Sequence, residues 1–454
     1  MSEAADVTTE KMPLPLIGTR VIDMTAVYAG PTCTRILAEL GAEVILVEPT
    51  YRRGLGLIYP ENRPTGEYWN EAGYFIHRNL TKKGITLNLS RPQGREIFRR
   101  LVALADVVVE SNSPRVMKNF GLDYPHLREL KEDIIMVSLS GYGQQGPQAN
   151  YVAFGTALEA ASFSSITGYP GEAPSRTGVS FTDPISGVAA AAAVLLALDC
   201  RRRTGKGQFI DLAEREVGIV FTGEAIMDYT MNQRLTKPRG NRHPAWAPQG
   251  CYPCRGESTW IVMAVSSQEE WNSLYHALGD PPWCQEETFA DPLSRCQHHD
   301  ELDGYIAAWT REQDCHQAVD VLRQWGVNAA PVNTGREVMT DPHLEARGLF
   351  QKVSHPRVGA RIYPRQLPPL FSGWAPAPLT PAPLLGEHNE EVLKGLLGMR
   401  DEDVAQLEAE KVIGVEQLVP HQGYPKGLDL SLLQEAGSLL SIDEEYRKQL
   451  GLDG

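Results

Sequence analysis

Asp183 is the residue best placed to act as a covalent nucleophile. Pro184 follows it, and the apolar run 188–193 comes shortly afterwards. An Asp-Pro pair typically starts a helix, with Asp at the N-cap and Pro at the first helical position, so a capping role alone also explains the pair. The apolar run predicts a buried helix. A carboxylate at the N-terminus of a buried helix is held ionised by the helix dipole, and carboxylates are established covalent nucleophiles.

Two turns offer backbone groups beside which a ligand can bind. The turn 26–31 leads from a predicted strand into a predicted helix, whose first N–H groups can hold an anion. The segment 140–143 (Ser-Gly-Tyr-Gly) follows a buried strand, and ligands of open α/β sheets bind at the carboxyl ends of strands. Glu48 ends the second predicted strand, as the ribose-binding acid of a dinucleotide fold does. The three-glycine fingerprint of that fold is missing, and an ordinary connection explains each turn equally well.

Basic side chains gather in two further segments. Residues 78–83 (Arg-Asn-Leu-Thr-Lys-Lys) open a predicted strand, where Lys82 and Lys83 can hold phosphates as point charges, although such a run is more often a solvated face. The loop 240–250 carries Arg242 and His243, and loops of this kind between domains often close over a site. A plain surface role also explains His243.

The composition favours a cytoplasmic protein. The chain has 454 residues, which suits two or three domains, and its net charge of −14 argues against nucleic acid as a partner. We find no signal peptide, and the apolar stretch 188–198 is too short to span a membrane. Seven scattered cysteines suit reduced thiols. Cys251 and Cys254 form a C-x-x-C with no second paired motif, so we interpret them as structural rather than as zinc ligands.

The elements that must position these residues follow an α/β pattern. Strand, helix and strand alternate from residue 20, which predicts an open, Rossmann-like parallel sheet. A long helix near 214–232 and a smaller α+β domain come next. The predicted strands are 20–25, 43–47, 85–89, 107–110, 134–139 and 260–265, and the predicted helices are 32–40, 93–104, 268–278, 302–309 and 316–325.

Taken together, these segments resemble the class III CoA-transferases, the CaiB/BaiF family that includes formyl-CoA transferase and crotonobetainyl-CoA transferase. The motifs keep their order from about residue 15 to about 413, nearly the whole chain, and this order makes a set of short motifs specific. The motifs are 21–25 (VIDMT), 29–31 (AGP), 40–45 (LGAEVI), 47–49 (VEP), 105–110 (ADVVVE), 140–143 (SGYG), 182–184 (TDP) with Gly187, 204–208 (TGKGQ) and 386–388 (GEH).

The resemblance implies a fold in which two chains interlock as rings. It also implies a large domain built from both chain ends, with the small domain inserted, in a homodimer or a heteromer with a homologous subunit. The expected divisions are a mobile N-terminus (1–14), the first part of a large CoA-binding domain (15–225), a linker and small domain (226–340), a return to the large domain (341–413) and a C-terminal extension (414–454).

Carried over position by position, the resemblance gives several residues a role. Asp183 falls on the catalytic aspartate. Val27, Tyr28 and Ala29 fall on the loop that contacts CoA near its thioester, and Tyr142 falls on a CoA-contacting tyrosine.

Three further residues, Lys82, Lys83 and Asn112, complete the expected CoA-binding set. The chain departs from formyl-CoA transferase in two places, because Pro49 replaces a CoA-binding arginine and the loop 242–250 replaces a mobile glycine run. The Asn-Arg-His-Pro sequence of that loop resembles members that act on succinate, mesaconate or benzylsuccinate. Arg242 and His243 are therefore expected to bind the acceptor.

The activity implied is transfer of CoA from an acyl-CoA donor, succinyl-CoA among the candidates, to a carboxylic acid. The CoA thioester is a substrate, and no permanently bound cofactor, metal, nucleic acid or membrane is expected. An intramolecular CoA-transferase would use the same residues. An α-methylacyl-CoA racemase is disfavoured because residues 151–156 lack the histidine of its acid/base pair. The presence of Asp183 argues against a non-catalytic partner subunit, and the missing glycine fingerprint argues against a nicotinamide dehydrogenase.

Overall fold

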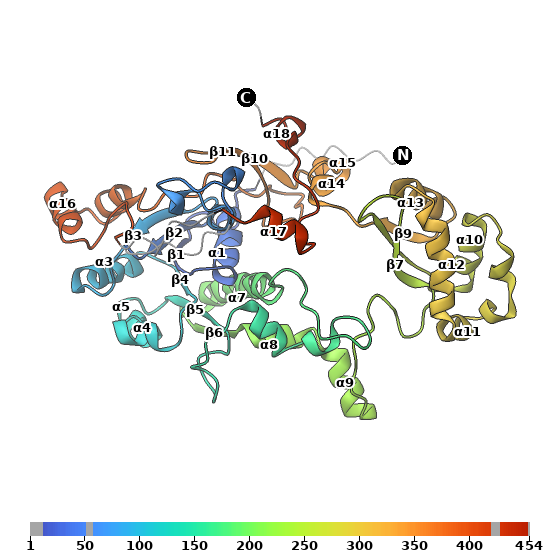
Figure 1. Cartoon of the computed structure of the whole chain (residues 1–454). Helices are drawn as coiled ribbons and strands as arrows, with labels where there is room; N and C mark the ends of the chain where they lie inside the picture. The colour runs from blue at the N-terminus through green and yellow to red at the C-terminus, as the bar shows by residue number, and fades with distance from the viewer. Residues whose placement is uncertain (1–11, 51–57, 419–426, 453–454) are drawn as a thin grey trace.

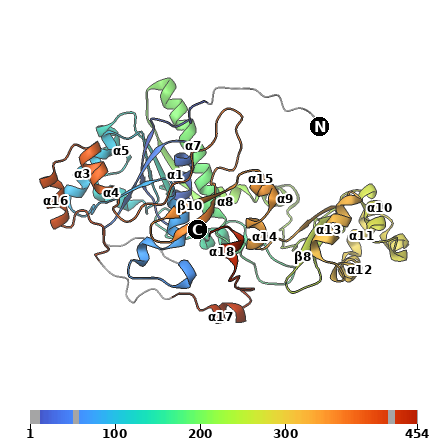
Figure 2. The same cartoon turned by 90° about the horizontal axis from the view of Figure 1, so that it is seen from above.

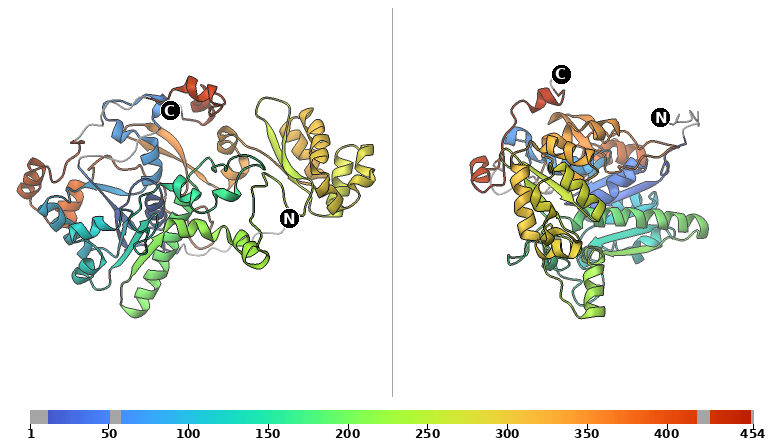
Figure 3. Two further views of the ribbon diagram at one scale, coloured as in Figure 1. Left: turned by 60° about the horizontal axis from the view of Figure 1, so that its bottom comes forward. Right: turned by 90° about the vertical axis from the view of Figure 1, so that its right-hand side faces the viewer.

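The computed structural model describes residues 12–50, 58–418 and 427–452, which form a large body and a smaller one (Figure 1). The large body contains a sheet with helices on both faces. The smaller body stands to one side and is joined to it by extended chain, as Figure 2 and Figure 3 show from other directions. The expected mobile N-terminus, residues 1–14, falls almost wholly outside the described residues.

All six strands of the large sheet run parallel, which confirms the predicted α/β class. Their order is β3-β2-β1-β4-β5-β6, so the winding reverses between β1 and β4 and leaves a crevice at the carboxyl ends of these strands. The sequence did not predict β6, whose side chains are alternately exposed at the sheet edge. The strands are β1 (Arg20–Met24), β2 (Glu43–Glu48), β3 (Lys83–Thr86), β4 (Val107–Glu110), β5 (Ile135–Ser140) and β6 (Phe209–Ala213).

Helices from both chain ends cover the sheet. α1 (Ala29–Glu39) and α7 (Thr182–Thr204) pack together on one face. α3 (Pro92–Ala103) lies on the other face, beside the π-helix η6 (Glu391–Leu396) and α16 (Asp401–Ala409), as Figure 1 shows. The other helical segments of this body are η1 (Pro60–Asn62), η2 (Tyr68–Asn70), α2 (Gly73–Asn79), α4 (Arg115–Phe120), α5 (Tyr124–Leu130), α6 (Gly155–Ala160) and η3 (Ser164–Ile166).

Helix α7 is less buried than its apolar sequence predicts. Ala190, Ala191 and Val194 are buried in the core shared with α1, whereas Val188 and Leu196 are 52% and 70% exposed. The prediction of a buried helix is wrong for this second face, because the rest of the chain covers only one side of it. Among the described residues, α7 alone is long and apolar enough to cross a membrane, and 39% of that stretch is buried inside the molecule.

The long helix predicted over 214–232 is two helices, α8 (Glu214–Val220) and α9 (Gly223–Asn232). The break comes at Thr222, whose φ and ψ of −100° and 14° leave the helical region. Its hydroxyl donates a hydrogen bond to the carbonyl of Ile219 at 2.7 Å, which satisfies the end of α8. Apolar periodicity continues across the break, so the pattern alone did not reveal it.

The smaller body packs helices against a three-stranded antiparallel sheet, ordered β7-β8-β9. Its own core includes Trp271, Phe289 and Leu302, so it is an α+β unit as predicted. Its elements are β7 (Gln249–Pro253), β8 (Trp260–Ala264), α10 (Gln268–Ala277), η4 (Pro282–Gln285), η5 (Glu287–Phe289), α11 (Pro292–Gln297), α12 (His299–Arg311), α13 (Cys315–Gln324) and β9 (Asn328–Pro331).

The end of the chain is fastened back onto earlier segments. The Asn62 amide donates to the carbonyl of Leu428 and accepts from its N–H, both at 2.7 Å. Asp443 forms an ion pair of 2.8 Å with Arg336. These contacts join the expected extension 414–454 to two regions of the chain. The elements concerned are α14 (Gly335–Met339), α15 (Pro342–Ala346), the hairpin β10 (Phe350–His355) and β11 (Gly359–Pro364), α17 (Leu430–Glu435) and α18 (Tyr446–Gln449).

A buried ion pair ties β1 to the chain that enters β3. The Lys82 ammonium donates to the Asp23 carboxylate at 2.9 Å, and both side chains are fully buried. Lys82 also donates to Thr34 Oγ1 at 2.7 Å and to Asn79 Oδ1 at 2.9 Å. Asp23 accepts further hydrogen bonds from the backbone and hydroxyl of Thr25. The start of α1 and the turn before it are therefore fixed through these two charges.

We expect Lys82→Met to lower the free energy of unfolding by about 3–5 kcal/mol, because the Asp23 carboxylate stays buried without its counter-ion. Lys83→Met is the matched control. The Lys83 side chain is 34% exposed and pairs with Glu43 and Glu391, so its loss should cost at most about 1 kcal/mol. Urea unfolding followed by circular dichroism measures both variants. Equal, small losses would contradict the role given to Lys82.

Candidate active site

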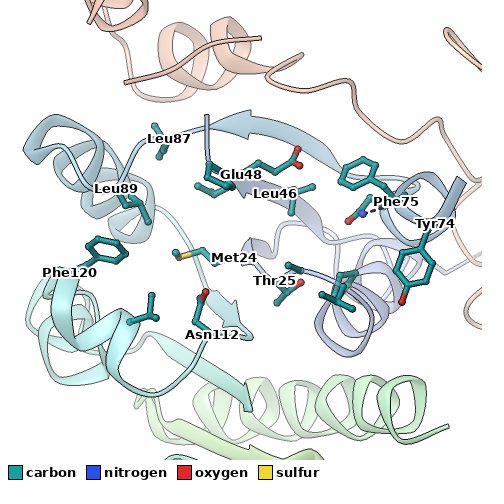
Figure 4. Close-up of a pocket in the computed structure, with 17 residues that line it drawn as sticks. Met24, Thr25, Leu46, Glu48, Tyr74, Phe75, Leu87, Leu89, Asn112 and Phe120 are labelled. Carbon is teal, nitrogen blue, oxygen red and sulfur yellow. Dashed lines mark hydrogen bonds between the residues drawn. The ribbon is translucent and has the colours of Figure 1, made fainter. Parts of the chain in front are cut away.

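The carboxyl ends of β1, β2 and β4 open into a cavity of about 400 Å³. Its wall is mainly apolar and comes from these strand ends, from α2 and from the turns that follow. Figure 4 shows Met24, Leu87, Leu89 and Phe120 around the space, together with the carboxylate of Glu48. Glu48 ends β2 as predicted. A mostly apolar cavity with a few polar groups at this edge of an α/β sheet is typical of a ligand site.

A second cavity, of about 160 Å³, shares Ala26, Val27 and Asn112 with the first. Asp183 and Glu214 line this smaller cavity. The two turns singled out in the sequence meet there as well, since Tyr28, Ala29, Ser140 and Gly141 belong to its wall. Segments far apart in the sequence thus converge on one carboxylate pair.

The turn before α1 holds Val27 in an unusual backbone conformation. Its φ is 69°, in the left-handed region, which costs a β-branched residue about 1–3 kcal/mol. The N–H of Ala26 donates to Ser111 Oγ at 3.1 Å and ties the turn to the chain after β4. Strain of this kind is concentrated at functional sites, where the surrounding structure enforces it.

Asp183 lies in the first turn of α7, two positions further into the helix than predicted. The helix begins at Thr182, its N-cap is Phe181, and no side chain caps it. The N-cap prediction for Asp183 is therefore wrong. Glu159 accepts from the N–H of Phe181, so a different carboxylate satisfies the start of the helix. Asp183 is 7% exposed, and its side chain is left to face the cavity.

Burial shapes the acidity of the two carboxyl groups. Desolvation raises the pKa of Asp183, with a smaller rise from the charge of Glu159, while a hydrogen bond with Glu214 and the charge of Arg78 oppose the rise. Desolvation, and after it the charge of Asp183, raises the pKa of Glu214 to about 8. Two carboxyl groups in hydrogen-bond contact cannot both ionise cheaply, so the pair holds one proton near neutral pH.

Arg78 acts on the charge of Asp183, which the sequence analysis did not predict. Its guanidinium lies between two aromatic rings, 3.6 Å from the centroid of Tyr28 and 3.4 Å from that of Tyr74. Such stacking holds a buried cation by cation–π attraction. Its positive charge also acts on Asp183. The run 78–83 contained this signal, but its basic character pointed to phosphates rather than to a buried carboxylate.

Residues 16–389 match the sequence profile of CoA-transferase family III. The chain belongs to this family. The protein is accordingly an enzyme, and CoA thioesters are the substrates of its class. Among the described residues, no group of three or more His, Cys, Asp or Glu side chains is arranged to hold a metal ion.

Proteins of known activity or structure align with most of the length of this CoA-transferase. It is 33% identical over 409 residues to the succinyl-CoA–D-citramalate CoA-transferase of Chloroflexus aurantiacus, covering 89% of this chain and 100% of that protein. It is 32% identical to the succinate–glutarate CoA-transferase of Agrobacterium fabrum, covering 84% and 96% respectively. The crystal structure of a CaiB/BaiF family protein from Brucella suis has a TM-score of 0.76 at 30% identity, covering 85% of this chain and 100% of that one.

The CoA-binding role predicted for Lys82 does not fit its position in the transferase, because its ammonium is enclosed with Asp23. Lys83 begins β3 and is therefore at the amino end of the sheet, opposite the two cavities. Both lysines were assigned from their charge alone. The ion pair with Asp23 encloses the Lys82 ammonium, and strand direction places Lys83 at the opposite edge of the sheet.

Two other expected CoA contacts lie at or near the cavities of the transferase. Asn112 lines both cavities, and its amide donates to Glu110 at 3.1 Å, which fixes its orientation. Tyr142 does not line either cavity. Its ring packs edge-on against Tyr151, at 5.7 Å between centroids, and Tyr151 belongs to the wall of the smaller cavity.

Arg242 and His243 lie outside the Asp183 cavity of the same chain. The Arg242 guanidinium is held by Asp300 and Asp303 of the smaller body, at 2.6 and 2.5 Å. His243 stacks on Trp246 with their ring centroids 4.1 Å apart. Within one chain the loop therefore does not close over the Asp183 cavity, as loops of its kind were expected to do, because the ion pairs bind it to α12.

Gly155, the first residue of α6, leaves room for the Asp183 side chain. A methyl group added there would lie 2.6 to 2.8 Å from the carboxylate atoms of Asp183. We expect Gly155→Ala to lower kcat about a hundredfold or more, since a misplacement of about 1 Å costs on this scale. Thermal unfolding should change little, because alanine suits a helix.

The matched control for this variant is Gly335→Ala. Gly335 also begins a helix, and an added methyl group would meet no atom within 4 Å. Steady-state kinetics of CoA transfer measures both variants. An unchanged kcat in Gly155→Ala would contradict the packing described around Asp183.

Glu214 should make the stability of the protein depend on pH. The native protein keeps this proton up to a pKa of about 8, whereas the unfolded chain releases it near the ordinary value of 4.5. The free energy of unfolding should therefore fall as pH rises from about 4.5 to about 8. Glu214→Gln should remove this part of the slope, measured by urea unfolding across the window. Parallel slopes in the two proteins would contradict the assignment.

Proposed function

We propose that this CoA-transferase moves CoA from an acyl-CoA donor to a carboxylic acid through covalent intermediates on Asp183. The observation that carries the proposal is a buried carboxylate, 7% exposed, in the wall of a cavity that continues into a larger apolar one at the sheet's switch point. Asp183 does not cap α7, and its side chain faces this space, as a reactive carboxylate requires.

The chemistry proceeds by four acyl transfers. An Asp183 oxygen attacks the donor thioester, the C–S bond breaks, and a mixed anhydride and CoA thiolate result. The thiolate attacks the Asp183 carbonyl, which releases the donor acid as a carboxylate and forms an aspartyl-CoA thioester. The acceptor carboxylate attacks this thioester and gives a second anhydride and thiolate. Attack of the thiolate on the acceptor carbonyl yields the new acyl-CoA and returns the Asp183 carboxylate.

The two cavities divide the substrate between them in this proposal. The smaller one takes the thioester, beside Val27, Tyr28 and Ala29, and the larger one takes more distant parts of CoA. Ala29 and Gly141 line the smaller cavity, and we assign the stabilisation of an oxyanion to their backbone N–H groups. The apolar wall limits the access of water while the anhydrides exist.

We propose dicarboxylic acids as substrates, with succinyl-CoA as a donor. The relatives from Chloroflexus aurantiacus and Agrobacterium fabrum, whose names specify succinyl-CoA or succinate with a second dicarboxylic acid, support this choice. Arg242 has the bidentate geometry that a second carboxylate requires. Because it lies outside the Asp183 cavity of its own chain, we assign its acceptor role to the junction of two interlocked chains, homologous or identical. Exposed apolar residues such as Leu196, Val220 and Met231 favour such an assembly.

Asp183→Asn and Asp183→Ala should both lose CoA transfer by at least about a thousandfold, because neither side chain can form an anhydride. Since the Asp183 side chain caps no helix, neither variant should lose much stability. Wild-type protein incubated with acyl-CoA and hydroxylamine should carry a hydroxamate on the peptide containing Asp183, detected by mass spectrometry.

The control is Asp199→Asn, an exposed aspartate near the other end of α7 that pairs with Arg202 and Arg203. It should keep full activity. Substantial transfer by Asp183→Asn, after mass spectrometry has excluded deamidation to Asp, would disprove the proposed mechanism.

A further inference from the structure

Glu214 is the second acid of the Asp183 cavity, and the mechanism above gives it no task. It is the first residue of α8 and directly follows β6, so two packed elements fix its backbone. Its side chain lines the smaller cavity and shares a hydrogen bond with Asp183. A hydrogen bond between two carboxyl groups requires a proton on one of them.

The surroundings decide which carboxyl group carries that proton. Asp183 faces the guanidinium of Arg78, which favours its charged form. Among the described residues, no cation acts on the acidity of Glu214, and Arg215 next to it donates to Gln148 at 2.6 Å instead. Glu159, on the adjoining helix α6, adds a further acid near Asp183 and no positive charge. The negative charge of the pair therefore resides on Asp183 and the proton on Glu214.

We propose that Glu214 is a positioning residue whose protonated carboxyl group donates a hydrogen bond to Asp183 and orients its nucleophilic oxygen. This role rests on the proposed function of Asp183. One Asp183 oxygen accepts the bond, and the other is left to attack the thioester. Glu214 keeps its proton throughout, so each acyl transfer balances as written above. The same bond stabilises the Asp183 carboxylate when it leaves in the last step.

The role has a consequence at alkaline pH. Once Glu214 loses its proton, it no longer donates and instead places a second negative charge beside Asp183. Repulsion between the two carboxylates then moves Asp183 out of its oriented position. The raised pKa of Glu214, about 8, sets the range in which activity should decline. Because the pair titrates as a unit, the limb of the pH profile belongs to both groups.

Two substitutions separate the hydrogen bond that Glu214 donates from the loss of its proton at alkaline pH. Glu214→Gln still donates a hydrogen bond through its amide but has no proton to lose. Its kcat at pH 7 should fall only several-fold, and the alkaline limb near pH 8 should disappear. Glu214→Leu removes the donor, and its kcat should fall about tenfold to a hundredfold, the scale of a hydrogen bond to a charged group. The readout is the pH dependence of kcat with succinyl-CoA and a dicarboxylic acid.

Glu216→Gln provides the matched control, because Glu216 is exposed on the same helix and does not line the cavity. It should keep the wild-type profile. An alkaline limb that persists in Glu214→Gln would overturn the role, and so would equal losses in Glu214→Gln and Glu214→Leu at pH 7. If either variant fails to fold, the pH dependence of wild-type unfolding still decides, since stability that does not fall towards pH 8 excludes a protonated Glu214.

The outcomes distinguish this inference from the proposed function. Hydroxamate trapping on Asp183 in every Glu214 variant that turns over, together with unaltered pH profiles, would refute the role of Glu214 and leave the nucleophile standing. Absence of trapping on Asp183 in wild-type protein would refute the nucleophile itself.

Discussion

The buried pair of Asp23 and Lys82 is the interaction on which the site depends. Two opposite charges that are buried away from water attract each other strongly. Their burial is stable only if their other hydrogen-bond donors and acceptors also have partners. Thr25, Thr34 and Asn79 meet that need here, and each belongs to a different part of the chain around the cavity. A salt bridge in the core thus fixes a turn whose own conformation, at Val27, is unfavourable.

Burial also sets the acidity of the carboxyl groups in the smaller cavity. A carboxylate in water is a weak nucleophile surrounded by hydration, and the cavity replaces that hydration with a few fixed partners. Glu214 and the guanidinium of Arg78, which is stacked between Tyr28 and Tyr74, both act on the acidity of Asp183. The two rings matter because they fix the position of Arg78. Its positive charge is therefore available near the cavity without a mobile side chain.

The sequence predicted the elements better than the contacts between them. Short apolar runs predicted five of the six parallel strands, and the resemblance pointed to Asp183 and the turn at residues 27–29, which line one cavity. The charge of Lys82 alone led to a wrong prediction. A lysine in a basic run gives no sign that it will pair with a buried aspartate 59 positions earlier in the sequence. Glu214 escaped notice for a related reason. Its partner lies on another helix, and only the packing of α8 against α7 brings the two acids together.

The fastening of Asn62 to Leu428 has a topological meaning. These residues are 366 positions apart, so their hydrogen bonds close most of the polypeptide into a loop that contains the smaller body. In a dimer of interlocked chains, two such loops pass through one another like links. Separation of the links would then require one loop to open first, and the lifetime of the dimer would depend on the closure of each chain as well as on the surface between the chains. The C-terminal segment lies beyond the part matched to the family and would hold this loop closed.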